Sequence, residues 1–435
     1  MQSLYSRAHR QAYHRSVLPN GLRIVSAPKL EAESVAIGVW IGAGGRYENA
    51  RVNGISHLLE HLLFKGTRSL SCRQIKEAIE GRGGALNAFT DEEFTCVWAK
   101  VQPGNLEETV RLLTDMVLFP ALHPKELEKE KAVVIEEIRM YKDLPMQSVH
   151  DILNALLWPR HPLGMSLTGT EISLRRIRRK DLVSYQQRFY TPSNICIAAC
   201  GRLTHRSLVE SVTKLWTKVP SGRAHPFRRA RQSQRSPRLK VDANETEQSH
   251  LCLGFHAFPR NHPQIQALNL LNVVLGGNMS SRLFEEVREK RGLCYEIGSH
   301  VRRFRDTGLF SVSAGVEHRH LLKSLTVILK ELKRVRREPV SPREFEQAVE
   351  FFVGQLLFAL EDTVEHMCWA GECEIVLGEV EPAERIIGQV AKVHRSDLTQ
   401  VARGILRPDR MSLAVIGPVK EKTSHQMEQI LAGVS

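Results

Sequence analysis

An internal repeat is the feature that most constrains how this chain can fold. Residues 123–138 read HPKELEKEKAVVIEEI and residues 341–356 read SPREFEQAVEFFVGQL, and an ungapped alignment places Pro124 against Pro342. A proline at the first helical position with acidic residues in the first turn is typical of a helix start. An apolar stretch containing a glycine lies upstream of each copy, at residues 34–40 and 249–255. The sequence therefore predicts a tandem duplication.

The two copies are separated by a stretch of linker-like composition. Between about residues 217 and 240, Arg, Pro, Ser and Gln replace the apolar periodicity found on both sides. We therefore expect an N-terminal domain over residues 1–216, a basic linker over 217–240 and a C-terminal domain over 241–435. Alternating apolar runs indicate strands, which mix with helices without a regular βαβ rhythm. This predicts an α+β fold of two homologous halves, each a mainly antiparallel sheet packed with helices.

The charge balance is basic, with 61 Lys and Arg against 48 Asp and Glu, a net charge of +13. Much of the surplus lies in short clusters at residues 175–180, 223–240 and 333–338. None is interleaved with the aromatic side chains that a single-strand nucleic-acid platform uses, so we interpret them as solvated faces and a linker. No apolar run approaches the roughly 18 residues of a membrane span. We expect neither nucleic acid nor a membrane as a partner.

The N-terminal segment MQSLYSRAHRQAYHR has three arginines and no acidic residue. It lacks the apolar core of a secretory signal, and either a short transit-like leader or an irregular first strand fits it. The eight cysteines contain no CxxC pair, which indicates free thiols in a reducing compartment. We favour the cytoplasm over the mitochondrial matrix.

The segment GISHLLEHLLFKGT, residues 54–67, carries the most informative chemistry. His57 and His61 are four residues apart, so on a helix both imidazoles lie on one face and can reach one metal ion. With Glu60 between them, the motif is the inverted His-x-x-Glu-His of the inverzincin type. The alternative is an amphipathic helix whose histidines only form hydrogen bonds. Burying these polar groups among leucines without a partner would be costly, which favours a metal site.

A catalytic zinc needs a third protein ligand and an open position for water. Glu136 and Glu137 follow in the repeat segment. Glu137 shares a helix face with Glu130, Val133, Val134 and Tyr141, whereas Glu136 lies about 100° around the helix and is expected to face solvent. This stripe predicts Glu137 as a ligand with Glu130 as a second carboxylate behind it. The alternative for both is an ordinary exposed helix glutamate.

Several segments together resemble the pitrilysin/insulinase metallopeptidase family, close to the mitochondrial processing peptidases and their single-chain bacterial relatives. Glu137 stands 76 residues after His61, which is the family's spacing between second and third ligand. The segments that carry the resemblance are LPNGLRIV (18–25), GISHLLEHLLFKGT (54–67), GGALNAFTDEEFT (83–95), EKEKAVVIEEI (128–138), HPLGMSLTGT (161–170), FYTPSNICIAACGRL (189–203) and GGNMSSRLFEEVREKRGLCYEIGS (276–299).

The resemblance implies one Zn²⁺ per chain held by His57, His61 and Glu137. It implies that Glu60 is the general base and that Glu130 is an outer carboxylate near the site. Such a zinc ion polarises a water molecule, whose proton the base accepts and returns to the leaving amine.

In the second half, Arg288 and Tyr295 match the family's Arg and Tyr, which hold the scissile carbonyl or its oxyanion. Asn87 and Ala88 match an edge-strand segment that binds the substrate main chain. The alternatives are a surface arginine for Arg288, a strand asparagine satisfied by a turn, and a small core alanine.

The second half lacks the metal ligands. Asn269, Asn272 and Val273 stand where the first half has His57, Glu60 and His61; Ala348 faces Glu130 and Gln355 faces Glu137. A single chain with both the ligands and the Arg/Tyr pair indicates a self-sufficient homodimer, in which the resemblance implies that the pair comes from the facing chain.

We therefore predict a zinc metalloendopeptidase that acts on peptides or unfolded segments. Two alternatives belong to other classes: a catalytically inactive structural subunit of the same fold, and a basic nucleic-acid binder.

Overall fold

The computed structural model describes residues 12–223 and 225–433. The chain divides into two compact units. Unit 1 comprises the described residues within 1–138, 166–228 and 356–385, and unit 2 those within 139–165, 229–355 and 386–435.

Unit 1 is built on a six-stranded sheet in the order β1-β2-β6-β3-β5-β4. β2 and β6 are parallel, and the other neighbouring pairs are antiparallel. The strands are β1 (His14–Val17), β2 (Arg23–Pro28), β3 (Val35–Ile41), β4 (Ala85–Thr90), β5 (Thr95–Val101) and β6 (Ile195–Gly201). The helices are α2 (Ile55–Leu63), α3 (Cys72–Ile79), α4 (Leu106–Leu118), α5 (Pro124–Lys142), α7 (Glu171–Arg176), α8 (Arg179–Phe189), α9 (His205–Trp216) and α13 (Thr363–Leu377).

Unit 2 is built on a five-stranded sheet in the order β7-β11-β8-β10-β9. Its strands are β7 (Arg238–Ala243), β8 (Ser249–Ala257), β9 (Cys294–Arg303), β10 (Gly308–Val316) and β11 (Ser412–Gly417). Its helices are α6 (Pro145–Leu157), α10 (Ile265–Gly276), α11 (Leu321–Arg337), α12 (Pro342–Ala359), α14 (Ala383–Val390), α15 (Arg395–Ile405) and α16 (Glu421–Ala432), with a π-helix, η6 (Phe284–Glu289). Helices α5, α12 and α14 contain residues of both units. Short 3₁₀ helices in the two units are η1 (Gly45–Tyr47), η2 (Glu80–Arg82), η3 (Pro103–Asn105), η4 (Pro162–Gly164), η5 (Pro192–Asn194), η7 (His318–His320) and η8 (Pro408–Arg410).

The two sheets share one topology, as the repeat predicts. The order β2-β6-β3-β5-β4 matches β7-β11-β8-β10-β9, and the parallel pair β7/β11 matches β2/β6. The other neighbours in the second sheet are antiparallel. β1 is an additional strand of the first sheet. The predicted α+β fold of two homologous, mainly antiparallel halves is confirmed.

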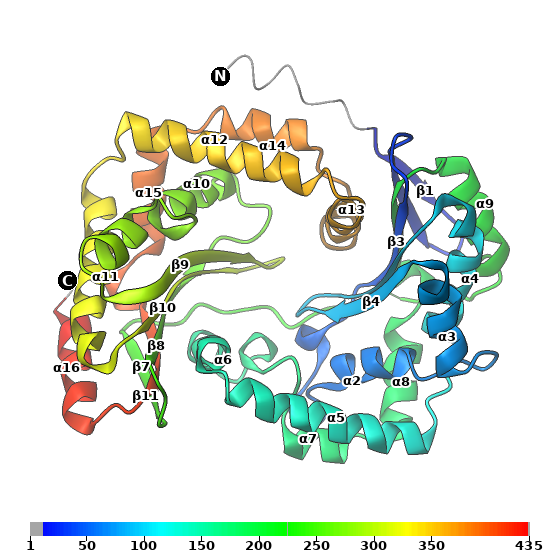
Figure 1. Cartoon of the computed structure of the whole chain (residues 1–435), viewed down its shortest axis with the longest axis horizontal. Coiled ribbons are helices and arrows are strands. Elements are labelled where there is room, and N and C mark those ends of the chain that lie inside the picture. Colours follow the sequence, from blue (N-terminus) through cyan, green and yellow to red (C-terminus); the bar gives the residue numbers. More distant parts are fainter. Residues whose placement is uncertain (1–11, 224, 434–435) are drawn as a thin grey trace. The chain divides into compact units, whose positions relative to one another are not determined.

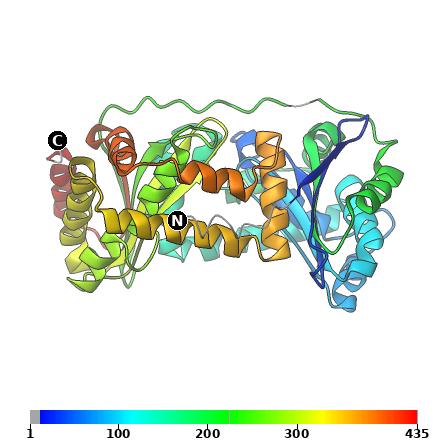
Figure 2. The same ribbon diagram turned by 90° about the horizontal axis from the view of Figure 1, so that it is seen from above.

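The two units exchange one helix each. α13, which follows the second repeat in sequence, packs on β3 and β6 of unit 1 (Figures 1 and 2). α6, which follows the first repeat, packs on β8 and β11 of unit 2 (Figure 1). The expected domains, residues 1–216 and 241–435, place α6 in the first half and α13 in the second, whereas α6 belongs to unit 2 and α13 to unit 1. Between the end of α9 at Trp216 and the start of β7 at Arg238, the described residues form neither helix nor strand (Figure 2).

A glycine in the central strand of each sheet makes room for the exchanged helix. A Cβ at Gly38 of β3 would lie 2.7 Å from the sulfur of Met367 on α13. A Cβ at Gly254 of β8 would lie 2.7 Å from the side chain of Leu153 on α6. Because real Cβ atoms essentially never approach so closely, a larger residue at either position would force the Met367 or Leu153 side chain to move.

Buried polar contacts fix α13 to unit 1. The fully buried Glu374 carboxylate accepts hydrogen bonds from Arg15 at 3.1 Å, and Arg23 donates to the Glu374 carbonyl at 2.9 Å. The Tyr13 hydroxyl lies 2.7 Å from Nε2 of His366. A core on the opposite face of the sheet joins it to the site-bearing helix α2 and to α4 and α9. Within the described residues, no helix has the length and apolar character to cross a bilayer.

Candidate metal site

Helix α2 carries the His-x-x-Glu-His motif and is anchored at its N-terminus by Glu48. Gly54 precedes the helix with a φ of 88°, and one Glu48 oxygen accepts from its backbone N–H at 2.7 Å. The other oxygen accepts from the Ser56 backbone N–H at 2.9 Å. These contacts satisfy N–H groups that a helix start leaves free. Burial raises the pKa of Glu48 to about 7.

The leucine-rich face of α2 lies in the core. Leu58, Leu59, Leu62 and Leu63 are no more than 1% exposed. This agrees with the predicted spacing and makes the helix a rigid support for its polar face.

His57, His61 and Glu137 converge on one point. Nε2 of His57 lies 3.8 Å from one Glu137 oxygen, and Nε2 of His61 lies 3.7 Å from the other. Ligand atoms around a tetrahedral zinc ion with bonds of about 2.0–2.1 Å are separated by roughly 3.3 Å, so small side-chain movements would close the site. Within the part of the chain that the structure describes, this is the group of His, Cys, Asp and Glu side chains with metal-site spacing.

The chemistry of these donors fits zinc. Two imidazole nitrogens and one carboxylate are a common ligand set of catalytic zinc, and they leave a position for water. Burial, reinforced by the neighbouring His61, lowers the pKa of His57 to about 4. His57 is therefore neutral near pH 7, which is the form that binds a metal.

Glu130 lies behind His61. Its carboxylate is 3.2 Å from Nδ1 of His61, and its other oxygen is 2.8 Å from Nζ of Lys65. Glu130 is only 4% exposed. The sequence singled out Glu130 but not Lys65. The position of Lys65 in the sequence gives no sign that its side chain reaches a carboxylate on another helix.

Glu60 lies beside the ligands without belonging to their cluster. The Thr90 hydroxyl donates to one Glu60 oxygen at 2.5 Å, and the other oxygen accepts no hydrogen bond from the described residues. Burial and then the charge of Glu137 raise the pKa of Glu60, whereas Thr90 and His61 oppose this shift. Thr90 was also missed by the sequence, since only the fold brings β4 to α2.

Asn87 and Ala88 lie on β4, at the edge of the first sheet. β4 pairs with β5, and its other side has no partner strand among the described residues. Asn87 is exposed, and its side-chain oxygen accepts from the Ala88 backbone N–H at 2.8 Å. Ala88 is partly exposed, so it is not a fully buried core alanine. The open edge is of the kind that extended peptides join.

Arg288 and Tyr295 lie together in unit 2. Cζ of Arg288 is 4.6 Å from the ring centre of Phe284 and 5.2 Å from that of Tyr295. Tyr295 is 77% exposed. Arg288 lies on the π-helix η6, and such turns occur often at functional sites.

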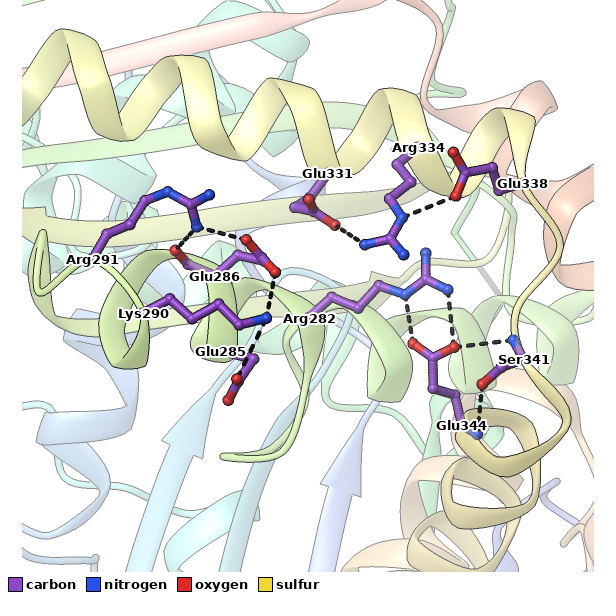
Figure 3. Close-up of polar contacts among 10 residues, drawn as sticks. All are labelled: Arg282, Glu285, Glu286, Lys290, Arg291, Glu331, Arg334, Glu338, Ser341 and Glu344. Atoms are coloured by element: carbon purple, nitrogen blue, oxygen red, sulfur yellow. Dashed lines mark hydrogen bonds and ion pairs between the residues drawn. The ribbon is translucent and has the colours of Figure 1, made fainter.

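Ion pairs hold the segment around η6, as Figure 3 shows. Just before η6, Arg282 donates to both oxygens of Glu344 at 2.7 and 3.1 Å. Within it, the Glu286 carboxylate accepts from Lys290 at 2.8 Å and from Arg291 at 2.5 Å. These contacts tie the Arg288 segment to α12 and to its own C-terminal turn.

Two residues of the predicted stripe on α5 are wrong. Val134 is fully buried, but Val133 is 49% exposed and Tyr141 is 37% exposed. The buried positions follow Glu130 at intervals of four and eight residues, Val134 and Ile138, so Val133 falls outside the covered arc. Glu136 is exposed, as predicted.

The fold and the site together define a two-unit protein with an inverted His-x-x-Glu-His centre in one unit. The family model "Insulinase (Peptidase family M16)" matches residues 23–171, and the model "Peptidase M16 inactive domain" matches residues 176–352. The chain therefore belongs to the insulinase family of M16 peptidases.

Bacterial relatives match over almost the whole chain. An uncharacterized zinc protease of Bacillus subtilis is 37% identical, over 93% of this chain and 98% of that protein. An uncharacterized zinc protease of Streptomyces coelicolor is 34% identical, over 96% and 92% respectively.

Two solved structures share the fold. A protease from Helicobacter pylori superposes with a TM-score of 0.88 at 22% identity, covering 94% of this chain and all of that one. A Pseudomonas fluorescens structure described as a peptidase M16 inactive domain gives 0.86 at 19% identity, with 94% and 98% covered.

Proposed function

We propose that this chain is a zinc-dependent metalloendopeptidase that hydrolyses peptides or unfolded segments. The observation that carries the proposal is the convergence of His57, His61 and Glu137, with the non-ligand carboxylate of Glu60 beside them. The family membership and the names of the bacterial relatives support it.

The residues of unit 1 have complementary parts in this reaction. When bound, zinc would lower the pKa of a water molecule and polarise the scissile carbonyl. With the metal in place, Glu60 would accept a proton from the attacking water and return it to the leaving amine, and its raised pKa brings it closer to that of a general base. Thr90 holds one carboxylate oxygen of Glu60, which leaves the other for the proton.

The substrate main chain binds along the edge of β4 near Asn87 and Ala88, which favours extended peptides with loose sequence preference. Arg288 and Tyr295 donate to the scissile carbonyl as negative charge develops on it. They are supplied by the second chain of a homodimer. The bacterial sources of the relatives support a bacterial cytoplasmic location as part of this proposal.

The test is zinc content together with cleavage of a quenched-fluorescence peptide mixture. We expect about one zinc per chain, and Glu60→Gln should retain the metal while losing about 10²–10⁴-fold in turnover. Glu136→Gln, at an exposed position beside Glu137, is the matched control and should retain both. A chain that binds zinc but cleaves no peptide would favour the inactive-subunit alternative. Wild-type hydrolysis by Glu60→Gln would exclude Glu60 as the base.

The shared site has a separate test. Glu60→Gln and Arg288→Ala chains are each expected to be inactive, and mixing them should recover activity. No recovery in verified heterodimers would refute completion of the site by a partner.

A further inference from the structure

A chain of three side chains leads away from the metal cluster. Nζ of Lys65 lies 2.8 Å from one oxygen of Glu130, and the other oxygen lies 3.2 Å from Nδ1 of His61. Nε2 of His61 faces Glu137. His57 has no such support, since its buried Nδ1 lacks a hydrogen-bond partner among the described residues. One of the two imidazoles is therefore oriented by a neighbour and the other is not.

Charge explains why Glu130 needs Lys65. A carboxylate that is 4% exposed is costly to bury unless a cation accompanies it. One Glu130 oxygen pairs with the Lys65 ammonium and the other faces Nδ1 of His61. A carboxylate in this position is an acceptor, so Nδ1 of His61 carries the hydrogen that faces it. The lone pair of Nε2 then points to the metal position, which is how outer carboxylates orient metal-binding histidines.

The second unit shows what happens to these residues where the ligands are missing. α10 corresponds to α2, and Val273 stands in place of His61. Lys65 follows His61 by four residues, and four residues after Val273 the chain has Gly277. On α12, Ala348 stands in place of Glu130. The counterparts of Lys65 and Glu130 are therefore absent together with those of the ligands.

The hydrogen bond from Thr90 to Glu60, unlike the pair of Lys65 and Glu130, has a counterpart in unit 2. β4 and β9 are the matching edge strands of the two sheets, and each carries a hydroxyl side chain that contacts the matching helix, Thr90 contacting α2 and Ser299 contacting α10. Asn272 stands in place of Glu60, and the Ser299 hydroxyl donates to its side-chain oxygen at 2.8 Å. A hydroxyl contact between strand and helix is thus present with or without ligands. The packing of the fold therefore explains the hydroxyl contact, which both units contain. It does not explain the pair of Lys65 and Glu130, which only unit 1 contains.

We propose that Lys65 is a positioning residue of the metal centre and that it acts through Glu130 on the ring of His61. This inference rests on the proposed function only in taking zinc as the ion. Lys65 contacts Glu130 and not a ligand. Because it acts only through the orientation of the His61 ring, its removal should change the affinity for the ion.

The test measures the zinc dissociation constant by competition with a chromogenic chelator. Lys65→Met removes the charge and keeps the aliphatic length, and it should weaken binding about 10-fold, at the lower end of the range for outer-shell changes. Lys65→Arg should restore most of the affinity. Lys129→Met is the matched control: Lys129 lies beside Glu130 in sequence, but it is exposed and pairs with Glu126, so affinity should not change.

A second measurement isolates the path through Glu130. In a Glu130→Gln background, Lys65→Met should have no further effect on the dissociation constant, because the residue through which it acts is gone. In ¹⁵N NMR of the folded, zinc-loaded chain, the wild-type His61 ring should carry its hydrogen on Nδ1.

The outcomes separate the two proposals. If the wild-type chain takes up zinc and Lys65→Met binds it equally well, or if Lys65→Met is equally harmful without Glu130, the positioning role is overturned alone. If the wild-type chain takes up no zinc, the proposed function is overturned as well.

Discussion

Lowering the pH should loosen α13 from unit 1 through His366. This histidine is fully buried, with Nε2 2.7 Å from the Tyr13 hydroxyl and Nδ1 3.2 Å from the Leu360 carbonyl. Burial, with a smaller effect of Lys29, lowers its pKa from 6.5 to about 4. The folded chain therefore holds His366 neutral at pH values where the unfolded chain would protonate it.

The magnitude follows from linkage between protonation and folding. Between pH 6.5 and about 4 the unfolded state binds more protons at this position, so the free energy of unfolding falls as the pH falls. The contribution of His366 is complete above pH 6.5 and is lost progressively down to about pH 4. At about 1.4 kcal/mol per pKa unit the full effect is about 3 kcal/mol, of which about 2.5 kcal/mol is lost at pH 4.5.

The assay is urea denaturation of the wild-type chain and of His366→Gln at pH 7.5 and 4.5, followed by circular dichroism and tryptophan fluorescence. The variant is expected to be less stable at pH 7.5, but its free energy of unfolding should fall by about 2.5 kcal/mol less on acidification. His425→Gln, at an exposed histidine, should fall in parallel with the wild type. If wild type and His366→Gln also fall in parallel, His366 is not the neutral buried group described here.

Three further changes test the site. Gly54→Ala should destabilise the chain by about 1–2 kcal/mol and lower its zinc content, measured by thermal unfolding and metal analysis, because Gly54 has a φ of 88° and a Cβ would lie 2.6 Å from the Thr168 carbonyl oxygen. Thr90→Val should retain zinc but lower the turnover number, and Thr90→Ser should restore it; loss of zinc would instead indicate a structural role. Removal of zinc with a chelator should abolish peptide hydrolysis, and addition of one equivalent should restore it.

Local periodicity explains what the sequence could predict. His57 and His61 face one way because they are four residues apart on one helix, and Glu130 and Glu137 share the face of another. The repeat likewise predicted two sheets of one topology, since each copy supplies the same succession of strands and helices.

Contacts distant in the sequence explain the rest. Thr90 and Lys65 reach Glu60 and Glu130 only after β4, α2 and α5 have packed together. The exchange of α13 was equally invisible, because its fit against β3 depends on Gly38 more than 300 residues earlier. Such pairs follow no period, so a single sequence does not reveal them.

Comparison of the two units also indicates how the proposed base, Glu60, is held in place by a packing contact that both units share. In both units a hydroxyl on the edge strand donates to a side-chain oxygen of the helix that follows the central strand, Thr90 to Glu60 and Ser299 to Asn272. A carboxamide in that position can accept the hydrogen bond but cannot act as a base, whereas a carboxylate can do both. The position of Glu60 is therefore fixed by a contact that both units contain. The ligands, Glu130 and Lys65 are the additions that distinguish unit 1 as the half suited to a metal ion.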